Sequence, residues 1–201
     1  MSILYLLFFL ITLGLSHPIF AAEGLLEEID ICAKIKEPIA RLKCYDALQE
    51  KYKVSRGRWK IKTKIYPDES RHIYLTLRAD KPVEAYSEKY TPTLVLRCKE
   101  EKTVVYIITG IAPSIDHEED GVGVLLRFDN ERAKEYLFTS KSTKDQILFA
   151  PNPISLINKM LKHKTMQFQF TPLNTFPTMT TFNLAGLATV IDELQSACHW
   201  K

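Results

Sequence analysis

The segment WKIKTKI, residues 59–65, decides the fold class because its apolar and charged side chains alternate with a period of two. The apolar positions are Trp59, Ile61 and Ile65, and the basic positions are Lys60, Lys62 and Lys64. Residues 73–78, IYLTLR, repeat the same alternation after a short polar interval. Such a period is typical of β-strands with one buried face. The segment therefore predicts a strand with a basic outer side at the start of a β-rich domain.

Further strands are expected downstream, since runs rich in β-branched and aromatic residues recur with turn residues between them. They span Thr93–Lys99, Thr103–Thr109, Val122–Phe128, Glu135–Thr139 and Met166–Thr171. This regular spacing predicts an antiparallel sheet or sandwich.

Helical spacing of apolar residues flanks the strands. It predicts helices over residues 25–35, 39–52, 153–163 and 185–197, with Leu42, Tyr45, Leu48 and Tyr52 as the apolar stripe of the second. The fold class is therefore α+β, an antiparallel sheet or sandwich with an N-terminal helical hairpin and a C-terminal helix. We expect a helical cap over residues 23–56 and a β-rich domain over residues 57–201, packed together as one unit.

The composition excludes several protein classes. With 201 residues, 46% hydrophobic and 25% charged, the chain is neither disordered, collagen-like nor a coiled coil. Its formal charge of +3 is too small and too dispersed for an obligate nucleic-acid binder.

The first 22 residues predict a signal peptide. They contain no Asp, Glu, Lys or Arg, and Ile3–Leu15 is almost entirely apolar. This run is shorter than a membrane span, and Ala21 and Ala22 offer a cleavage point before Glu23. Export to the periplasm follows; the alternative is an inner-membrane anchor formed by the uncleaved segment.

Four cysteines behind an export signal predict disulfides, because an oxidising compartment preserves them. Cys32 and Cys44 flank Glu37-Pro38, where one helix should end and the next begin, so a bond between them would join a helical hairpin. Cys98 then pairs with Cys198 by elimination. The alternative is four reduced, buried thiols.

No catalytic or cofactor motif emerges. The sequence lacks a phosphate-binding Gly-rich loop, a Gly-x-Ser-x-Gly elbow and a His-Glu-x-x-His helix. We therefore expect no catalytic residues, no cofactor and no metal site, with an undetected hydrolase as the alternative.

Three other features each allow two interpretations. The run Asp116–Asp120 could hold a hard cation, but a solvated hairpin tip is favoured because the spacing of a calcium loop is missing. A row of aromatic residues could line a groove, but a core role is favoured. The row comprises Phe168, Phe170, Phe176, Phe182 and Trp200.

The third feature is the basic stripe, which is our candidate contact surface. It comprises Arg58, Lys60, Lys62 and Lys64. These side chains could meet an acidic partner, although a charged strand face also serves to prevent sheets from associating.

The order of several short motifs resembles the VasI or TagO family of accessory proteins associated with bacterial type VI secretion systems. The motifs are Cys32, RLKCYD at 41–46, Trp59, LVLRC at 94–98, RFD at 127–129, FNLAGL at 182–187 and ACHW at 197–200. The resemblance implies an exported, disulfide-bonded periplasmic accessory protein of a Gram-negative bacterium, with no catalytic residue to carry over. Its partners would be type VI secretion components or peptidoglycan-associated proteins. The alternative function is a freestanding periplasmic inhibitor of a wall-degrading enzyme, or a ligand-binding module.

Overall fold

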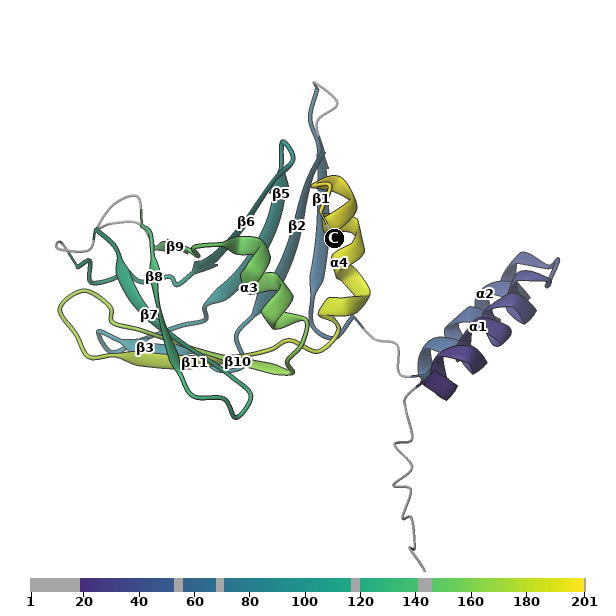
Figure 1. Ribbon diagram of the computed structural model, residues 1–201, viewed down its shortest axis with the longest axis horizontal. Coiled ribbons are helices and arrows are strands. Elements are labelled where there is room, and N and C mark those ends of the chain that lie inside the picture. The colour runs from purple at the N-terminus through teal and green to yellow at the C-terminus, as the bar shows by residue number, and fades with distance from the viewer. Residues whose placement is uncertain (1–18, 53–55, 68–70, 117–119, 141–145, 201) are drawn as a thin grey trace, which may run out of the picture. The chain divides into compact units, whose positions relative to one another are not determined.

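The computed structural model describes residues 19–52, 56–67, 71–116, 120–140 and 146–200, and it contains two compact units, residues 1–54 and 55–201 (Figure 1). Most of the predicted signal peptide lies outside the described residues. Among the helices that the structure describes, none is long and apolar enough to cross a membrane. The packing of the two units against each other stays a prediction.

The first unit is a disulfide-linked helical hairpin. Helix α1 spans Ile19–Ala33 and α2 spans Pro38–Tyr52. The Glu37 carboxylate accepts hydrogen bonds from the backbone N–H groups of Ile39, at 3.0 Å, and of Ala40. With Pro38 as its first residue, α2 begins where the sequence indicates. The bond between Cys32 and Cys44 links the two helices, with the Cα atoms 5.6 Å apart.

The expected apolar stripe of α2 is only partly buried. Leu48 is buried and Tyr45 is half-buried, but the Leu42 side chain is 61% exposed. A two-helix hairpin covers one narrow face of each helix, so it buries only part of this stripe.

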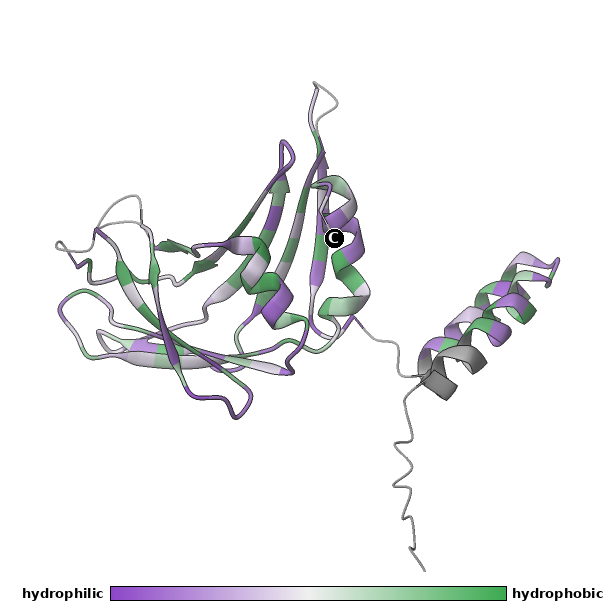
Figure 2. Ribbon diagram, viewed as in Figure 1, coloured by the Kyte–Doolittle hydropathy of each residue, from purple (hydrophilic) through white to green (hydrophobic). Residues whose placement is uncertain are grey.

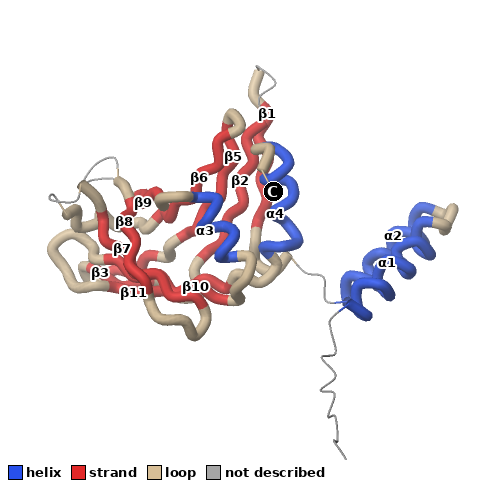
Figure 3. Tube along the Cα trace, in the orientation of Figure 1, coloured by secondary structure: helices blue, strands red, loops and turns tan. Residues whose placement is uncertain are grey.

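The second unit contains two antiparallel sheets (Figure 3). The five-stranded sheet has the order β1 (Lys60–Ile65), β2 (Arg71–Arg78), β5 (Thr93–Lys99), β6 (Lys102–Ile108) and β9 (Ile147–Phe149). The four-stranded sheet has the order β11 (Thr178–Asn183), β10 (Thr165–Phe170), β7 (Val122–Phe128) and β8 (Lys134–Phe138). A short hairpin pairs β3 (Val83–Ala85) with β4 (Glu88–Tyr90). The predicted α+β class is confirmed.

The core lies between the two sheets. Leu75 and Leu77 of β2 point inward from the five-stranded sheet, and Phe168 and Phe170 of β10 point inward from the other. Figure 2 shows the resulting alternation of hydrophobic and hydrophilic residues along the strands. Phe182 is buried as expected, but Phe176 is 86% exposed because it precedes β11 instead of lying within a strand. The core interpretation was therefore wrong for Phe176.

Two helices cover part of the inner face of the five-stranded sheet. Helix α4, Leu187–Ala197, packs on β2 and β5 through Leu187, Val190, Ile191 and Leu194. Helix α3, Pro153–Met160, packs on β6 through Leu156, Ile157 and Met160. Both helices begin two residues or fewer from the positions that the sequence predicts.

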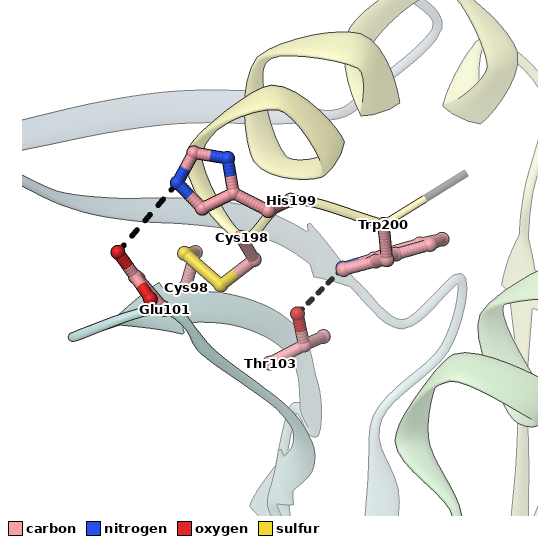
Figure 4. The surroundings of a disulfide bond; sticks show 6 residues. All are labelled: Cys98, Glu101, Thr103, Cys198, His199 and Trp200. Atoms are coloured by element: carbon pink, nitrogen blue, oxygen red, sulfur yellow. Dashed lines mark hydrogen bonds and ion pairs between the residues drawn. A yellow bond between two sulfur atoms is a disulfide. The ribbon is translucent and has the colours of Figure 1, made fainter.

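A second disulfide holds the C-terminal end of the chain against the β5–β6 hairpin (Figure 4). Cys98 of β5 is bonded to Cys198, just after α4, with the Cα atoms 5.8 Å apart. Beside this bond the Trp200 indole N–H donates to the Thr103 hydroxyl at 2.7 Å, and His199 Nε2 lies 3.6 Å from a Glu101 carboxylate oxygen. Both bonds join the cysteines that the sequence pairs.

Candidate functional site

The outer face of the five-stranded sheet carries a candidate site. Antiparallel register places Lys62 of β1 beside Tyr74 of β2, and Tyr74 beside Arg97 of β5. In the next row, Lys60 lies beside Thr76. Side chains that are directly opposite in an antiparallel pair share a face, so the lysines of β1 continue into a surface of tyrosines, threonines and arginines.

This face is hollowed into a groove of about 720 Å³. We call it the basic groove. Its charged lining consists of Arg58, Lys60, Lys62, Lys64 and Arg78. Its remaining lining includes Tyr74, Thr76, Thr93, Val95, Tyr106 and Ile108. The structure thus brings all four residues of the predicted contact surface into one groove.

The lining of the basic groove is cationic without compensation by acidic residues, because no Asp or Glu is among the described residues that form it. Arg58 is partly neutralised by an ion pair with Asp80 at the margin. Ion pairs this exposed contribute little to stability. The described residues place no carboxylate against Lys60, Lys62 or Lys64, so these three ammonium groups, together with Arg78, give the groove its positive charge.

Aromatic rings form part of the floor of the groove. The Lys64 ammonium lies 5.8 Å from the ring centre of Tyr74, and the Arg97 guanidinium lies 5.7 Å from the ring centre of Tyr106. Burial raises the pKa of the Tyr106 phenol, although the Arg97 charge acts in the opposite direction. The phenol therefore stays neutral and can donate a hydrogen bond at physiological pH.

One buried donor lies near the floor. Arg97 Nε is buried and meets no hydrogen-bond acceptor within the described part of the chain. A buried donor left without a partner is costly.

The basic groove offers positive charges, aromatic rings and a phenol, which are suited to holding an acidic ligand. These side chains include no arrangement of a nucleophile with a base.

The sequence did not point to Tyr74, Arg78, Arg97 or Tyr106 as site residues. Tyr74 and Arg78 could have been found, because the alternation of β2 puts them on the polar side. Placing Tyr106 beside β5 needs the register of the β5–β6 hairpin, which depends on Glu100 and Glu101 adopting φ values of +49° and +60° in the turn. The sequence predicts a turn between these two strands, but non-glycine residues rarely adopt that conformation, so the type of turn and the register do not follow from it.

Of the acidic run, only Asp116 and Asp120 lie within the described ranges. Asp116 and Gly121 exchange backbone hydrogen bonds of 2.7 and 3.2 Å across the base of the turn, while residues 117–119 lie outside the described ranges. Within those ranges, no three His, Cys, Asp or Glu side chains are grouped so that they could hold a metal ion.

A second polar cluster surrounds Asp129, next to the β7–β8 connection. Its carboxylate accepts hydrogen bonds from the Thr165 N–H at 2.8 Å, the Thr165 hydroxyl at 3.0 Å and the Lys164 N–H at 3.1 Å. His163 Nδ1 lies 3.1 Å from the same carboxylate. These contacts tie the end of β7 to the start of β10, which is a structural role and accounts for the RFD motif at 127–129.

We expect the Asp129 contacts to make folding stability depend on pH. Burial opposes ionisation of Asp129, but the hydrogen bonds from Thr165, Lys164 and His163 outweigh it and lower the pKa to about 2. A carboxyl group whose pKa is depressed by folding stabilises the protein above its unfolded-state pKa, and this contribution is lost as the pH falls towards the folded-state pKa. Asp129→Asn should therefore lower Tm most at neutral pH, with the difference shrinking between about pH 4 and pH 2.

Thermal unfolding followed by circular dichroism across that pH range checks this expectation. Asp192→Asn, at an exposed position on α4, is the matched control. A Tm difference for Asp129→Asn that is the same at pH 7 and pH 2 would contradict the assignment.

Comparisons with known proteins show a family and a structural likeness. The model of the family described as type VI secretion system VasI, EvfG matches residues 31–200. None of the curated proteins matches. Among solved structures, the chain is similar to the crystal structure of invasion associated protein b from Bartonella henselae, at 13% identity and a TM-score of 0.47, over 71% of this chain and 93% of that chain.

Proposed function

Because the chain belongs to the VasI family of the type VI secretion system, we propose that it works in the periplasm as an accessory protein of that system and acts by binding, not by catalysis. Membership of this family implies an accessory role in type VI secretion. Two disulfides support the periplasmic location, since such bonds persist in oxidising compartments. The observation that carries the binding mode is the basic groove, with its lysines unopposed by any carboxylate in the described lining.

The proposed partner is a secretion component with an acidic surface. Complementary charge mainly raises the association rate and makes it sensitive to salt. The three lysines of β1 are exposed, so neutralising them removes charge without opening a cavity in the core. Function and folding can therefore be separated experimentally.

We expect the triple variant Lys60→Gln, Lys62→Gln, Lys64→Gln to fold like the parent and to support markedly less type VI secretion. Its capture of a purified acidic partner should be several-fold slower at about 0.05 M ionic strength, and the difference should largely vanish near 0.5 M because salt screens the charges. Secretion of a known effector by cells carrying each variant measures the function, and a salt series measures the association rate.

The matched control removes the same three positive charges from another part of the surface. Lys81, Lys89 and Lys162 are exposed and do not line the groove, so their triple glutamine variant should secrete like the parent. Equal secretion by both triple variants and the parent would refute the groove as the contact surface. The next candidate contact surface would then be the helical hairpin around Arg41 and Asp46. Stoichiometric inhibition of a muramidase by the parent, without any effect on secretion, would favour a freestanding inhibitor.

A further inference from the structure

Strand β1 forms one edge of the five-stranded sheet. In the described structure it pairs with β2 alone, in register from Lys60 opposite Thr76 to Ile65 opposite Arg71. Its other side therefore presents backbone N–H and C=O groups, which are a template for one more strand. Helices α3 and α4 pack over β6 and over β2 and β5, farther into the sheet.

The side chains of β1 differ between its two faces. Lys60, Lys62 and Lys64 line the basic groove. Ile61 and Ile65 alternate with them: Ile61 also contributes to the groove lining but lies opposite the inward-pointing Leu75, and Ile65 is 73% exposed. An added strand would place alternate side chains beside the lysines and the intervening ones beside the two isoleucines. The edge therefore matches a strand that is acidic on one face and apolar on the other.

We propose that the partner contributes an extended acidic segment, with carboxylates at every second position, which pairs with the free edge of β1 as a sixth strand of the sheet. This inference rests on the proposed function of the basic groove and names the chemistry of its ligand. Backbone hydrogen bonds to β1 supply affinity, and the carboxylates beside Lys60, Lys62 and Lys64 supply selectivity.

The lysines also determine which strands cannot pair with the edge of β1. Two copies of β1 paired with each other would bring like charges together, which is destabilising, whereas a carboxylate in each of those positions is favourable. Lysines on an edge strand prevent association of identical sheets. The same side chains therefore exclude a second copy of this chain and admit an acidic strand.

The experiment uses the full mature chain and a capped, fluorescent eight-residue peptide that alternates Glu with Val. Two further peptides carry backbone N-methyl groups on the Glu residues only or on the Val residues only. Successive N–H groups of a strand point to opposite edges, so only one of the two methylated peptides loses the hydrogen bonds that face β1. All three peptides have the same charge.

We expect the parent peptide to bind at low salt, one methylated peptide to bind at least about tenfold more weakly, and the other to bind within about threefold of the parent. The triple glutamine variant of β1 should bind all three weakly. A peptide with Lys in place of Glu should not bind. Fluorescence anisotropy measures each affinity.

Other outcomes would overturn the inference. Equal binding of both methylated peptides, still dependent on the lysines, would refute strand pairing and leave the basic groove as a charge-based contact surface. Absence of peptide binding together with lysine-dependent binding of soluble peptidoglycan chains would assign the groove to a glycan. The proposed function fails separately, since its test is secretion by the triple variant and not affinity for any peptide.

Discussion

Replacing Cys98 and Cys198 with alanine is expected to lower the free energy of unfolding of the β domain by about 4–5 kcal/mol. The bond closes a loop of sequence separation 100, which spans β6 to α4, and long loops gain most from cross-linking in the chain-entropy model. Alanine is chosen because both cysteines are buried and a serine hydroxyl would add its own burial cost.

The bond between Cys32 and Cys44 provides the comparison. Its sequence separation is only 12, so the same substitution there should cost about 3 kcal/mol and act on the helical hairpin. Denaturant unfolding followed by tryptophan fluorescence reports on the β domain, because both tryptophans, Trp59 and Trp200, lie in it. An unchanged unfolding midpoint for the Cys98→Ala, Cys198→Ala variant would contradict a structural role for this bond.

The second large effect is expected at Gly186, where the start of α4 crosses the segment that leads into β1. A Cβ atom on Gly186 would lie 2.1 Å from the carbonyl carbon of Arg56 and 2.4 Å from the amide nitrogen of Gly57. The φ of Gly186 is also +88°, in the region that favours glycine. Gly186→Ala should therefore destabilise the domain by about 3 kcal/mol or more.

Gly123→Ala is the matched control for this substitution. Gly123 lies in β7, and a Cβ atom there would meet only the flexible Glu135 side chain, at 3.1 Å. It should cost less than about 1 kcal/mol. Equal unfolding midpoints for the Gly186 and Gly123 variants, measured by the same fluorescence titration, would show that the two backbone segments do not cross closely.

The long periodic segments were predictable because local pattern and tertiary burial agree in them. β5 and β7 have the expected bounds, and β2 buries Ile73, Leu75 and Leu77 as its alternation indicates. The weak elements were missed for physical reasons. β3, β4 and β9 have three residues each, too few to show a period. In β11, half of the residues are threonine, and it was not recognised as a strand.

The candidate site could be predicted only at its edge. The lysines of β1 are neighbours in sequence, so a period of two is enough to group them on one face. Arg97 joins them only through two successive strand pairings and Tyr106 only through three, and the register of these pairings does not follow from a local pattern. Sequence reasoning therefore indicated the charge of the groove but not its aromatic floor.

Site-specific photo-crosslinking in living cells is the most direct measurement of the claim that the basic groove is the contact surface. A photoreactive amino acid replaces Lys62 in one strain and Lys89, which is 70% exposed on β4, in another. We predict a crosslink from position 62 to an identified type VI secretion component, lost when the secretion genes are deleted, and no such product from position 89. Equal crosslinking of that component from both positions, or none from position 62 in cells that secrete normally, would contradict it.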